Sequence, residues 1–174
     1  MCYVPLLVGF ATGFRRSELA ALNREDIEFT EQGMVIHQRR SKTDQEGKGR
    51  RLDFWRGGAL CPVRALEKWL KTANITSGAI FLRVHRSGAI SGKAMSGESV
   101  AAVVKKYLAL IGKDASLYGA HSLRRGLITS MAEAGANEVQ IMHCSGHHSS
   151  AMVREYIEQA QLFHGQNVTA LLGL

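Results

Sequence analysis

Five side chains in this sequence have the types and the spacing needed to act on one phosphodiester group. Tyr156 is a potential nucleophile, and it follows His147 by nine residues. Arg15 lies near the start, and His121 and Arg124 belong to one His-Ser-Leu-Arg segment. Arginine suits a phosphate because its planar guanidinium donates two parallel hydrogen bonds and stays charged at any accessible pH. The five residues therefore predict a phosphate-binding site with a nucleophile beside it.

A tyrosine nucleophile needs a group that receives its proton. The reference pKa of tyrosine, about 10, leaves the phenol mostly protonated at neutral pH, so a base or strongly cationic surroundings are required. His121 and the phosphate itself are both open as proton acceptors. The alternative role for Tyr156 is that of a core aromatic, because Met152, Val153 and Ile157 lie around it on a helical pattern.

The segments that hold these residues resemble the three boxes of the tyrosine recombinases, the phage-integrase family. Residues 12–19 are Thr-Gly-Phe-Arg-Arg-Ser-Glu-Leu, similar to a first box of Thr-Gly-Leu-Arg-x-Ser-Glu-Leu. Residues 121–124 are similar to the second box, His-x-Leu-Arg. Gly146, His147 and Tyr156 are similar to the third, a Gly-His with a tyrosine nine residues after the histidine. Each box alone is weak, so the information lies in their order and separation along nearly the whole chain.

The resemblance implies a catalytic role for each matched residue. Tyr156 would attack the scissile phosphorus and store the bond as a 3′-phosphotyrosine, so no cofactor is expected. Arg15 and Arg124 would hold the two nonbridging oxygens, a contribution of roughly 3 to 4 kcal/mol per donor in the transition state. His121 and His147 would donate to the phosphate or position the other groups.

The family also has a lysine on the hairpin that follows the first box. Lys42 is the best match for it and Lys48 is the second choice. This lysine would protonate the departing 5′ oxygen, with its pKa lowered by neighbouring cations. Glu18 matches an acidic residue that supports a histidine of the site in the family. A glutamate in a first helical turn is also favourable to the helix dipole on its own account.

The hairpin segment, residues 39–51, is strongly basic, with six Lys or Arg and two acidic residues. The whole chain has 22 Lys and Arg against 15 Asp and Glu, a formal charge of +7. This excess favours a polyanionic partner, and the resemblance implies double-stranded DNA. The hairpin residues that we predict to contact the DNA backbone are Arg39, Arg40, Lys48, Arg50 and Arg51.

The apolar pattern and the turn signals predict an α+β fold that is mostly helical, with a small three-stranded antiparallel sheet near the N-terminus. In this fold Arg15 lies in the tight connection after the first helix, which Gly13 ends, and Ser17 caps the second helix. The predicted strands are 27–30, 34–39 and 50–54. The predicted helices are 5–11, 18–22, 62–70, 100–111, 122–134, 137–143, 150–159 and 168–172.

Length and composition fit one globular domain, since 174 residues with 45% hydrophobic content can form one core. We expect residues 1–174 to be a single tyrosine-recombinase catalytic domain. Compared with the family, the chain begins without the first helix of that domain and without the N-terminal core-binding domain. We therefore expect a fragment that binds DNA weakly and in a salt-sensitive way when alone.

Three cysteines with no CxxC pair argue against a disulfide framework or a zinc ribbon and fit a reducing cytoplasm. Residues 143–148, His-Cys-Ser-Gly-His-His, offer a zinc site as an alternative, because imidazole and thiolate suit zinc. The spacing of closed zinc sites is absent, so no metal is predicted.

No apolar run approaches the roughly 20 residues of a membrane helix. The chain is thus predicted to be cytoplasmic and to have no membrane contact.

Family members assemble as tetramers on DNA, so the resemblance implies a homotetramer on DNA and allows a monomer when free.

Two other functions would be compatible with the same boxes and the same basic charge. One is a basic DNA-binding module that keeps the fold without catalysis, and the presence of every candidate catalytic side chain argues against it. The other is a relaxing enzyme like the type IB topoisomerases, against which the first box argues. Two departures from the family are Arg125, in place of a histidine, and Ser145, in place of a leucine.

Overall fold

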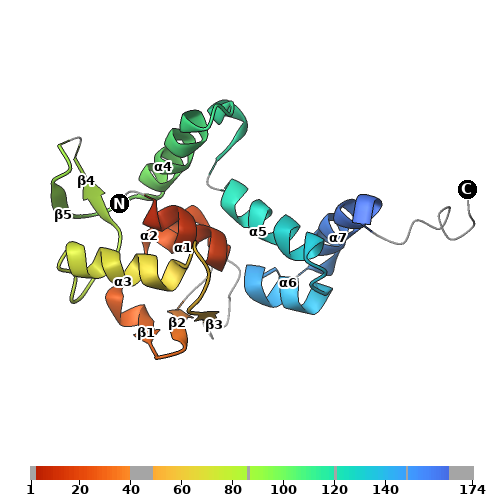
Figure 1. Cartoon of the computed structure of the whole chain (residues 1–174), viewed down its shortest axis with the longest axis horizontal. Helices are drawn as coiled ribbons and strands as arrows, with labels where there is room; N and C mark the ends of the chain where they lie inside the picture. Colours follow the sequence, from red (N-terminus) through yellow and green to blue (C-terminus); the bar gives the residue numbers. More distant parts are fainter. Residues whose placement is uncertain (1–2, 40–48, 86, 120, 148, 165–174) are drawn as a thin grey trace, which may run out of the picture.

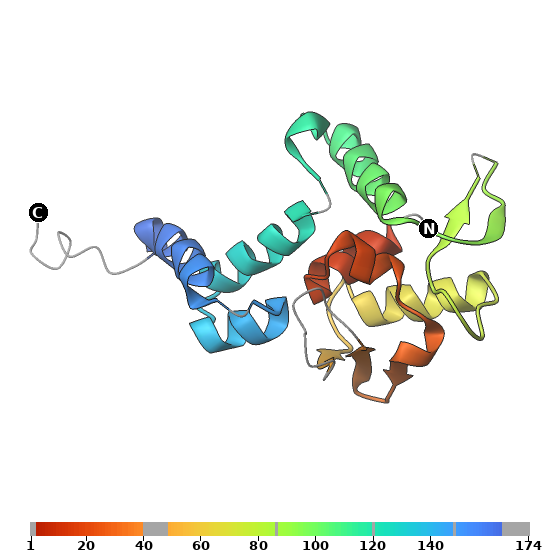
Figure 2. The ribbon, with the colours of Figure 1, turned by 180° about the vertical axis from the view of Figure 1, so that it is seen from behind.

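The computed structural model describes residues 3–39, 49–85, 87–119, 121–147 and 149–164, with side chains up to 159. Arg40, Lys42, Lys48 and the predicted helix at 168–172 lie outside these residues. Two groups of helices stand beside one another in Figures 1 and 2. The first group holds α1 (Val4–Thr12), α2 (Arg16–Ala20), α3 (Pro62–Thr72) and α4 (Gly97–Leu110), and the second holds α5 (His121–Glu133), α6 (Glu138–Ser145) and α7 (Ser150–His164).

The predicted three-stranded sheet is confirmed. Strands β1 (Ile27–Phe29), β2 (Gly33–Gln38) and β3 (Arg50–Trp55) are antiparallel in the order β1-β2-β3. Ile36 on the middle strand pairs with Ile27 on one side and Leu52 on the other, and all three side chains are buried. This face of the sheet belongs to the first core, where it packs with residues of the first helical group such as Val8 and Leu66.

A second hairpin, β4 (Leu82–Val84) with β5 (Ile90–Ala94), was not predicted from the sequence. Its strands are short, and most of β5 is exposed, so neither strand shows the apolar alternation that identifies a half-buried strand. Two short 3-10 turns, η1 (Arg24–Asp26) and η2 (Ala115–Leu117), complete the described elements. Within the described residues, none of the helices has both the length and the apolarity needed to cross a bilayer.

The turn that carries Arg15 begins where its glycine predicts. Gly13 caps α1 in the left-handed region, at φ 60°, and its N–H donates to the carbonyl of Gly9 at 3.0 Å. The prediction that Ser17 caps the second helix is wrong, because α2 starts at Arg16 with Arg15 at the N-cap. The Glu18 carboxylate, in the third position of the helix, accepts from the backbone N–H of the N-cap Arg15 at 2.8 Å.

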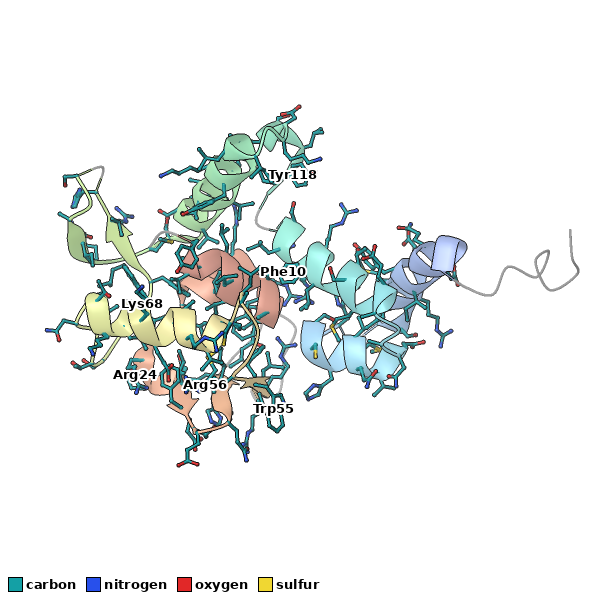
Figure 3. The ribbon with its side chains drawn as sticks, in the orientation of Figure 1. Phe10, Arg24, Trp55, Arg56, Lys68 and Tyr118 are labelled. Carbon is teal, nitrogen blue, oxygen red and sulfur yellow. The ribbon has the colours of Figure 1, made fainter. Side chains whose placement is uncertain are left out.

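The helices of the second group form a separate small core. Ile128, Ala132, Ile141 and Val153 are buried there, on α5, α6 and α7. The two groups meet where α1 packs on α5. Phe10, labelled in Figure 3, lies on α1 at this contact, and a Cβ at position 126 of α5 would come within 3.2 Å of its ring. The predicted helices of this group are confirmed, with α7 extending to His164.

Candidate active site

The Arg15 side chain is fixed by the carboxylate of Glu18. Nη1 of Arg15 donates to Oε1 of Glu18 at 2.8 Å, and the Arg15 backbone N–H donates to the other carboxylate oxygen. The glutamate side chain is 7% exposed and the arginine side chain 22%. The sequence interpretation gave Glu18 to a histidine of the site, whereas its hydrogen bonds in the structure are to Arg15. Glu18 thus holds both the backbone and the guanidinium of Arg15.

Arg124 is the most deeply placed cation of the site. The residue is 5% exposed, and Nη1 donates to the carbonyl of Gly13 at 3.0 Å, next to the turn that carries Arg15. Burial, and then the charge of Arg15, lower the pKa of Arg124 to about 10, while Glu18 acts in the opposite direction. The guanidinium therefore remains charged at neutral pH.

No carboxylate among the described residues forms an ion pair with Arg124. A buried cation without a paired anion is costly, since burial penalises the charged form. The charges of Arg15 and Arg50 lower the pKa of Arg124 further, so three guanidinium groups, here called the arginine cluster, lie near one another. Such an arrangement favours the binding of an anion beside Arg124.

His147 lies against Arg124 and is oriented by Ser145. The Ser145 hydroxyl is 2.6 Å from the carbonyl of Ile141 and 2.8 Å from Nδ1 of His147, and the residue is fully buried. A carbonyl can only accept, so the single hydroxyl proton goes to Ile141 and Nδ1 carries the proton that it donates to Ser145. Both ring nitrogens lie near Nη2 of Arg124, Nδ1 at 3.4 Å and Nε2 at 3.5 Å, and in a neutral imidazole with the proton on Nδ1 the acceptor is Nε2.

We expect Ser145→Ala to shift the tautomer equilibrium of His147 from the Nδ1–H form toward the Nε2–H form. Without the hydroxyl, Nδ1–H loses its acceptor, a change of about 1 kcal/mol or fivefold in the tautomer equilibrium. Long-range proton–nitrogen NMR of the imidazole should show the Nδ1–H form in the original chain and a larger Nε2–H fraction in the variant. Ser130→Ala, at an exposed serine of α5, is the control. A dominant Nε2–H form in the original chain would contradict the assignment.

The basic hairpin residues that the structure describes differ in their surroundings. Nε of Arg39 lies 2.5 Å from Oδ1 of the buried Asp26. Arg50 donates to carbonyls at the end of α6, a contact that the sequence did not indicate. Arg51 is exposed on β3. Arg39 and Arg51 are thus both exposed, with Arg39 paired to Asp26, whereas Arg50 is half-buried.

Tyr156 lies on α7 and is partly buried against the second core. In the part of the chain that the structure describes, its hydroxyl makes no hydrogen bond to Arg15 or Arg124. His121 is exposed as the first residue of α5, one turn before Arg124 on the same helix. The structure therefore brings Arg15, Glu18, Arg124 and His147 into direct contact with each other or with the same turn, and it leaves the Tyr156 ring packed against the second core.

The zinc alternative finds no support among the described residues, which contain no group of three or more His, Cys, Asp or Glu placed to hold a metal ion. His148 lies outside the described residues. Two contacts of the site were not predicted from the sequence. These are the hydrogen bond from His147 to Ser145 and the hydrogen bonds from Arg50 to the end of α6. The only signal for Ser145 was its departure from the family's leucine. For Arg50 the signal was strand alternation, which places it on the same face as the apolar Leu52 and Phe54.

Comparison with known proteins agrees with this site. Residues 2–162 match the Phage integrase family. An integrase/recombinase described as a XerD homolog from Selenomonas ruminantium is 43% identical over 160 residues, which cover 91% of this chain and 47% of the relative. The tyrosine recombinase XerC of Syntrophus aciditrophicus (strain SB) is 28% identical over 84% of this chain and 45% of the relative. The chain thus spans about half the length of the curated relatives it matches.

Solved structures show the same fold. The XerH site-specific recombinase, in a post-cleavage complex with a palindromic difH substrate, superposes with a TM-score of 0.72 at 19% identity. That superposition covers 99% of this chain and 45% of XerH. The matched segment contains all three boxes and the residues gathered around Arg124. This chain belongs to the phage integrase family of tyrosine recombinases.

Proposed function

We propose that this chain is the catalytic domain of a site-specific DNA recombinase that cleaves and rejoins strands through a 3′-phosphotyrosine. In the forward step the Tyr156 oxygen forms a bond to the scissile phosphorus and the bond from phosphorus to the 5′ oxygen breaks. Lys42 gives a proton to the departing oxygen, and the Tyr156 proton passes to His121 or to the phosphate. Rejoining is the reverse reaction with a 5′ hydroxyl of another strand, so neither nucleotide nor metal cofactor is consumed.

The observation that carries this proposal is the buried guanidinium of Arg124 beside Arg15. Charge grows on the two nonbridging oxygens of a phosphodiester as the pentacovalent transition state forms. Fixed donors aimed at that charge stabilise it without further rearrangement, which is the largest catalytic term in many enzymes. Glu18 fixes Arg15, the Gly13 carbonyl fixes Arg124, and Ser145 fixes His147. Two guanidinium donors and one imidazole are thus each held by a hydrogen bond within the protein.

The position of Tyr156 is compatible with this reaction. A phosphate held by Arg15 and Arg124 would lie between the guanidinium groups and the phenol. A direct hydrogen bond from Tyr156 to either arginine is therefore not needed in the absence of DNA. Its helix packs against α5, which carries Arg124 and His121, so the nucleophile and the second box belong to one helical group.

Double-stranded DNA is the proposed substrate, bound by a homotetramer during strand exchange. A net charge of +7 and the exposed Arg51 of the hairpin segment support a polyanionic substrate. The name of the XerH relative describes a complex with a difH substrate, which supports DNA as the ligand class. Two cleavages on each of two duplexes require several copies of one active site, which supports an assembly on DNA.

The proposal predicts covalent capture of DNA without a metal. The test incubates the chain at low salt with a pool of nicked suicide duplexes that carry a randomised core. Denaturing gels should show a protein–DNA adduct, and its yield should be the same with excess chelator, because only side-chain cations act in the reaction. Binding without any adduct would favour the non-catalytic DNA-binding module. An adduct lost in chelator and restored by zinc would favour the metal reading of residues 143–148.

A further inference from the structure

The side chain of Arg50 connects three parts of the molecule that are far apart in the sequence. From β3, its Nη1 donates to the carbonyls of His143 and Cys144 at the end of α6, each at 3.1 Å. Its Nε donates to Oε1 of Gln38 on β2, also at 3.1 Å. The guanidinium lies over the ring of Phe14, 5.5 Å from its centre. One cation thus touches the sheet, Phe14 of the first box and the end of α6, just before the third box.

The contact with α6 satisfies groups that a helix leaves unpaired. The last carbonyls of a helix have no intrahelical donor, and a cation at this end is favourable to the helix dipole. Helix α6 ends at Ser145, and Gly146 follows in the left-handed region at φ 66°. A Cβ at Gly146 would lie 2.5 Å from Nη1 of Arg50, so the guanidinium is close against the turn.

That turn leads directly to His147. Ser145 orients the imidazole from within α6, and the position of α6 itself is therefore part of the alignment of His147 with Arg124. Arg50 is the described side chain that ties the end of α6 to the hairpin segment and to Phe14, next to Arg15. Arg50 is half-buried, and burial lowers the pKa of its guanidinium.

We propose that Arg50 is a positioning residue that holds the His147 turn against the hairpin and the Arg15 turn, and that it does not act as a DNA-backbone contact. The catalytic part of this inference rests on the proposed function. The structural part does not, because it concerns only the contacts of Arg50 with α6, β2 and Phe14. The inference replaces our prediction from sequence that Arg50 belongs with the DNA-binding cations of the hairpin.

Arg51 offers a matched comparison on the same strand. Successive side chains of a strand point to opposite faces, so two neighbouring arginines have opposite surroundings. Arg50 pairs with Gln38 in the sheet register and turns inward, whereas Arg51 pairs with His37 and is exposed. The same substitution at both positions removes one positive charge in each case. Only the contacts with α6, Gln38 and Phe14 differ.

The experiment compares Arg50→Ala, Arg50→Lys and Arg51→Ala by two measurements. Hydrogen–deuterium exchange of the peptide covering 138–147 reports how firmly the end of α6 is held, without any need for activity. DNA affinity against salt reports phosphate contacts. For Arg50→Ala we expect faster exchange and an affinity within about twofold, with capture at saturating DNA slower by about tenfold or more. Arg50→Lys keeps the charge but cannot reach both carbonyls and Gln38 together, so exchange should also rise.

For Arg51→Ala we expect the opposite pattern, with exchange at the original level and a salt slope smaller by about one. The proposal is overturned if Arg50→Ala weakens DNA binding and flattens the salt slope as Arg51→Ala does, with unchanged exchange. If Arg50→Ala fails to fold, Arg50→Lys decides by the same two measurements. If the original chain captures no DNA, the proposed function fails, and the exchange data still decide the role of Arg50.

Discussion

Replacing Tyr156 by phenylalanine is expected to abolish covalent capture of a suicide duplex and to leave the affinity for that duplex unchanged. Phenylalanine lacks the oxygen that would form the bond to phosphorus, so no adduct can form at this position. The ring that packs against the second core is retained, so the fold and the DNA-binding surface should be preserved. The measurement is adduct yield on denaturing gels together with a filter-binding or gel-shift affinity.

The control for this result is Tyr118→Phe, which removes a tyrosine hydroxyl after η2 and outside the three boxes. Its adduct yield should equal that of the original chain. Capture by the Tyr156→Phe variant at the original level would assign the nucleophile to another side chain. Loss of both capture and DNA affinity in that variant would instead indicate that the hydroxyl is needed to bind DNA.

The second large effect is expected for Arg124→Lys, which should slow cleavage by about 10² to 10³. Lysine keeps one charge but loses the planar fork, so it cannot donate to the Gly13 carbonyl and to a phosphate oxygen in parallel. The site is 5% exposed, and burial that lowers the pKa of the arginine would also lower that of a lysine, which starts from about 10.4. Single-turnover capture at saturating DNA measures the loss.

Arg125→Lys is the matched control, since Arg125 is the next residue of α5 and is exposed. We expect the capture rate of the Arg125→Lys variant to stay within about twofold of that of the original chain, because substitutions at exposed positions usually have small effects. Thermal unfolding should be recorded for both variants, so that a loss of fold is separated from a loss of the fork. A rate for Arg124→Lys near that of Arg125→Lys would remove Arg124 from the catalytic set.

The local parts of this fold could be predicted because their causes lie close together in the sequence. Gly13 ends α1 and the turn at 31–33 separates β1 from β2, as short-range chemistry dictates. The start of α4 was predicted three residues too late, because the Ser96 cap was not recognised. The hairpin of β4 and β5 was missed because its strands are too short and too exposed to carry a pattern. Lys42, for which the resemblance alone argues, stays a prediction.

The site could be predicted as a set of residues but not as a set of contacts. Order and spacing identified Arg15, Arg124 and His147. The acceptors beside Arg15 and His147 are close in the sequence, whereas the acceptor for Arg124 and the contacts of Arg50 are determined by tertiary packing. The Arg124 bond to the Gly13 carbonyl joins residues 111 positions apart, and the Arg50 bond to Cys144 joins residues 94 apart. Periodicity within one element contains no information about such pairs. Glu18 was likewise found by its position, and its hydrogen bonds to Arg15 were not predicted.

The contact between α1 and α5 determines more than the packing of two helices. Arg15 follows α1 and Arg124 lies on α5, so the distance between the two phosphate donors is a property of the seam between two independent cores rather than of either core. A rotation of one helical group against the other changes that distance, and it also strains the bonds that cross the seam, from Arg124 to the Gly13 carbonyl and from Arg50 to the end of α6. The relative orientation of the two cores is therefore the property of this fold that holds the arginines at a fixed separation.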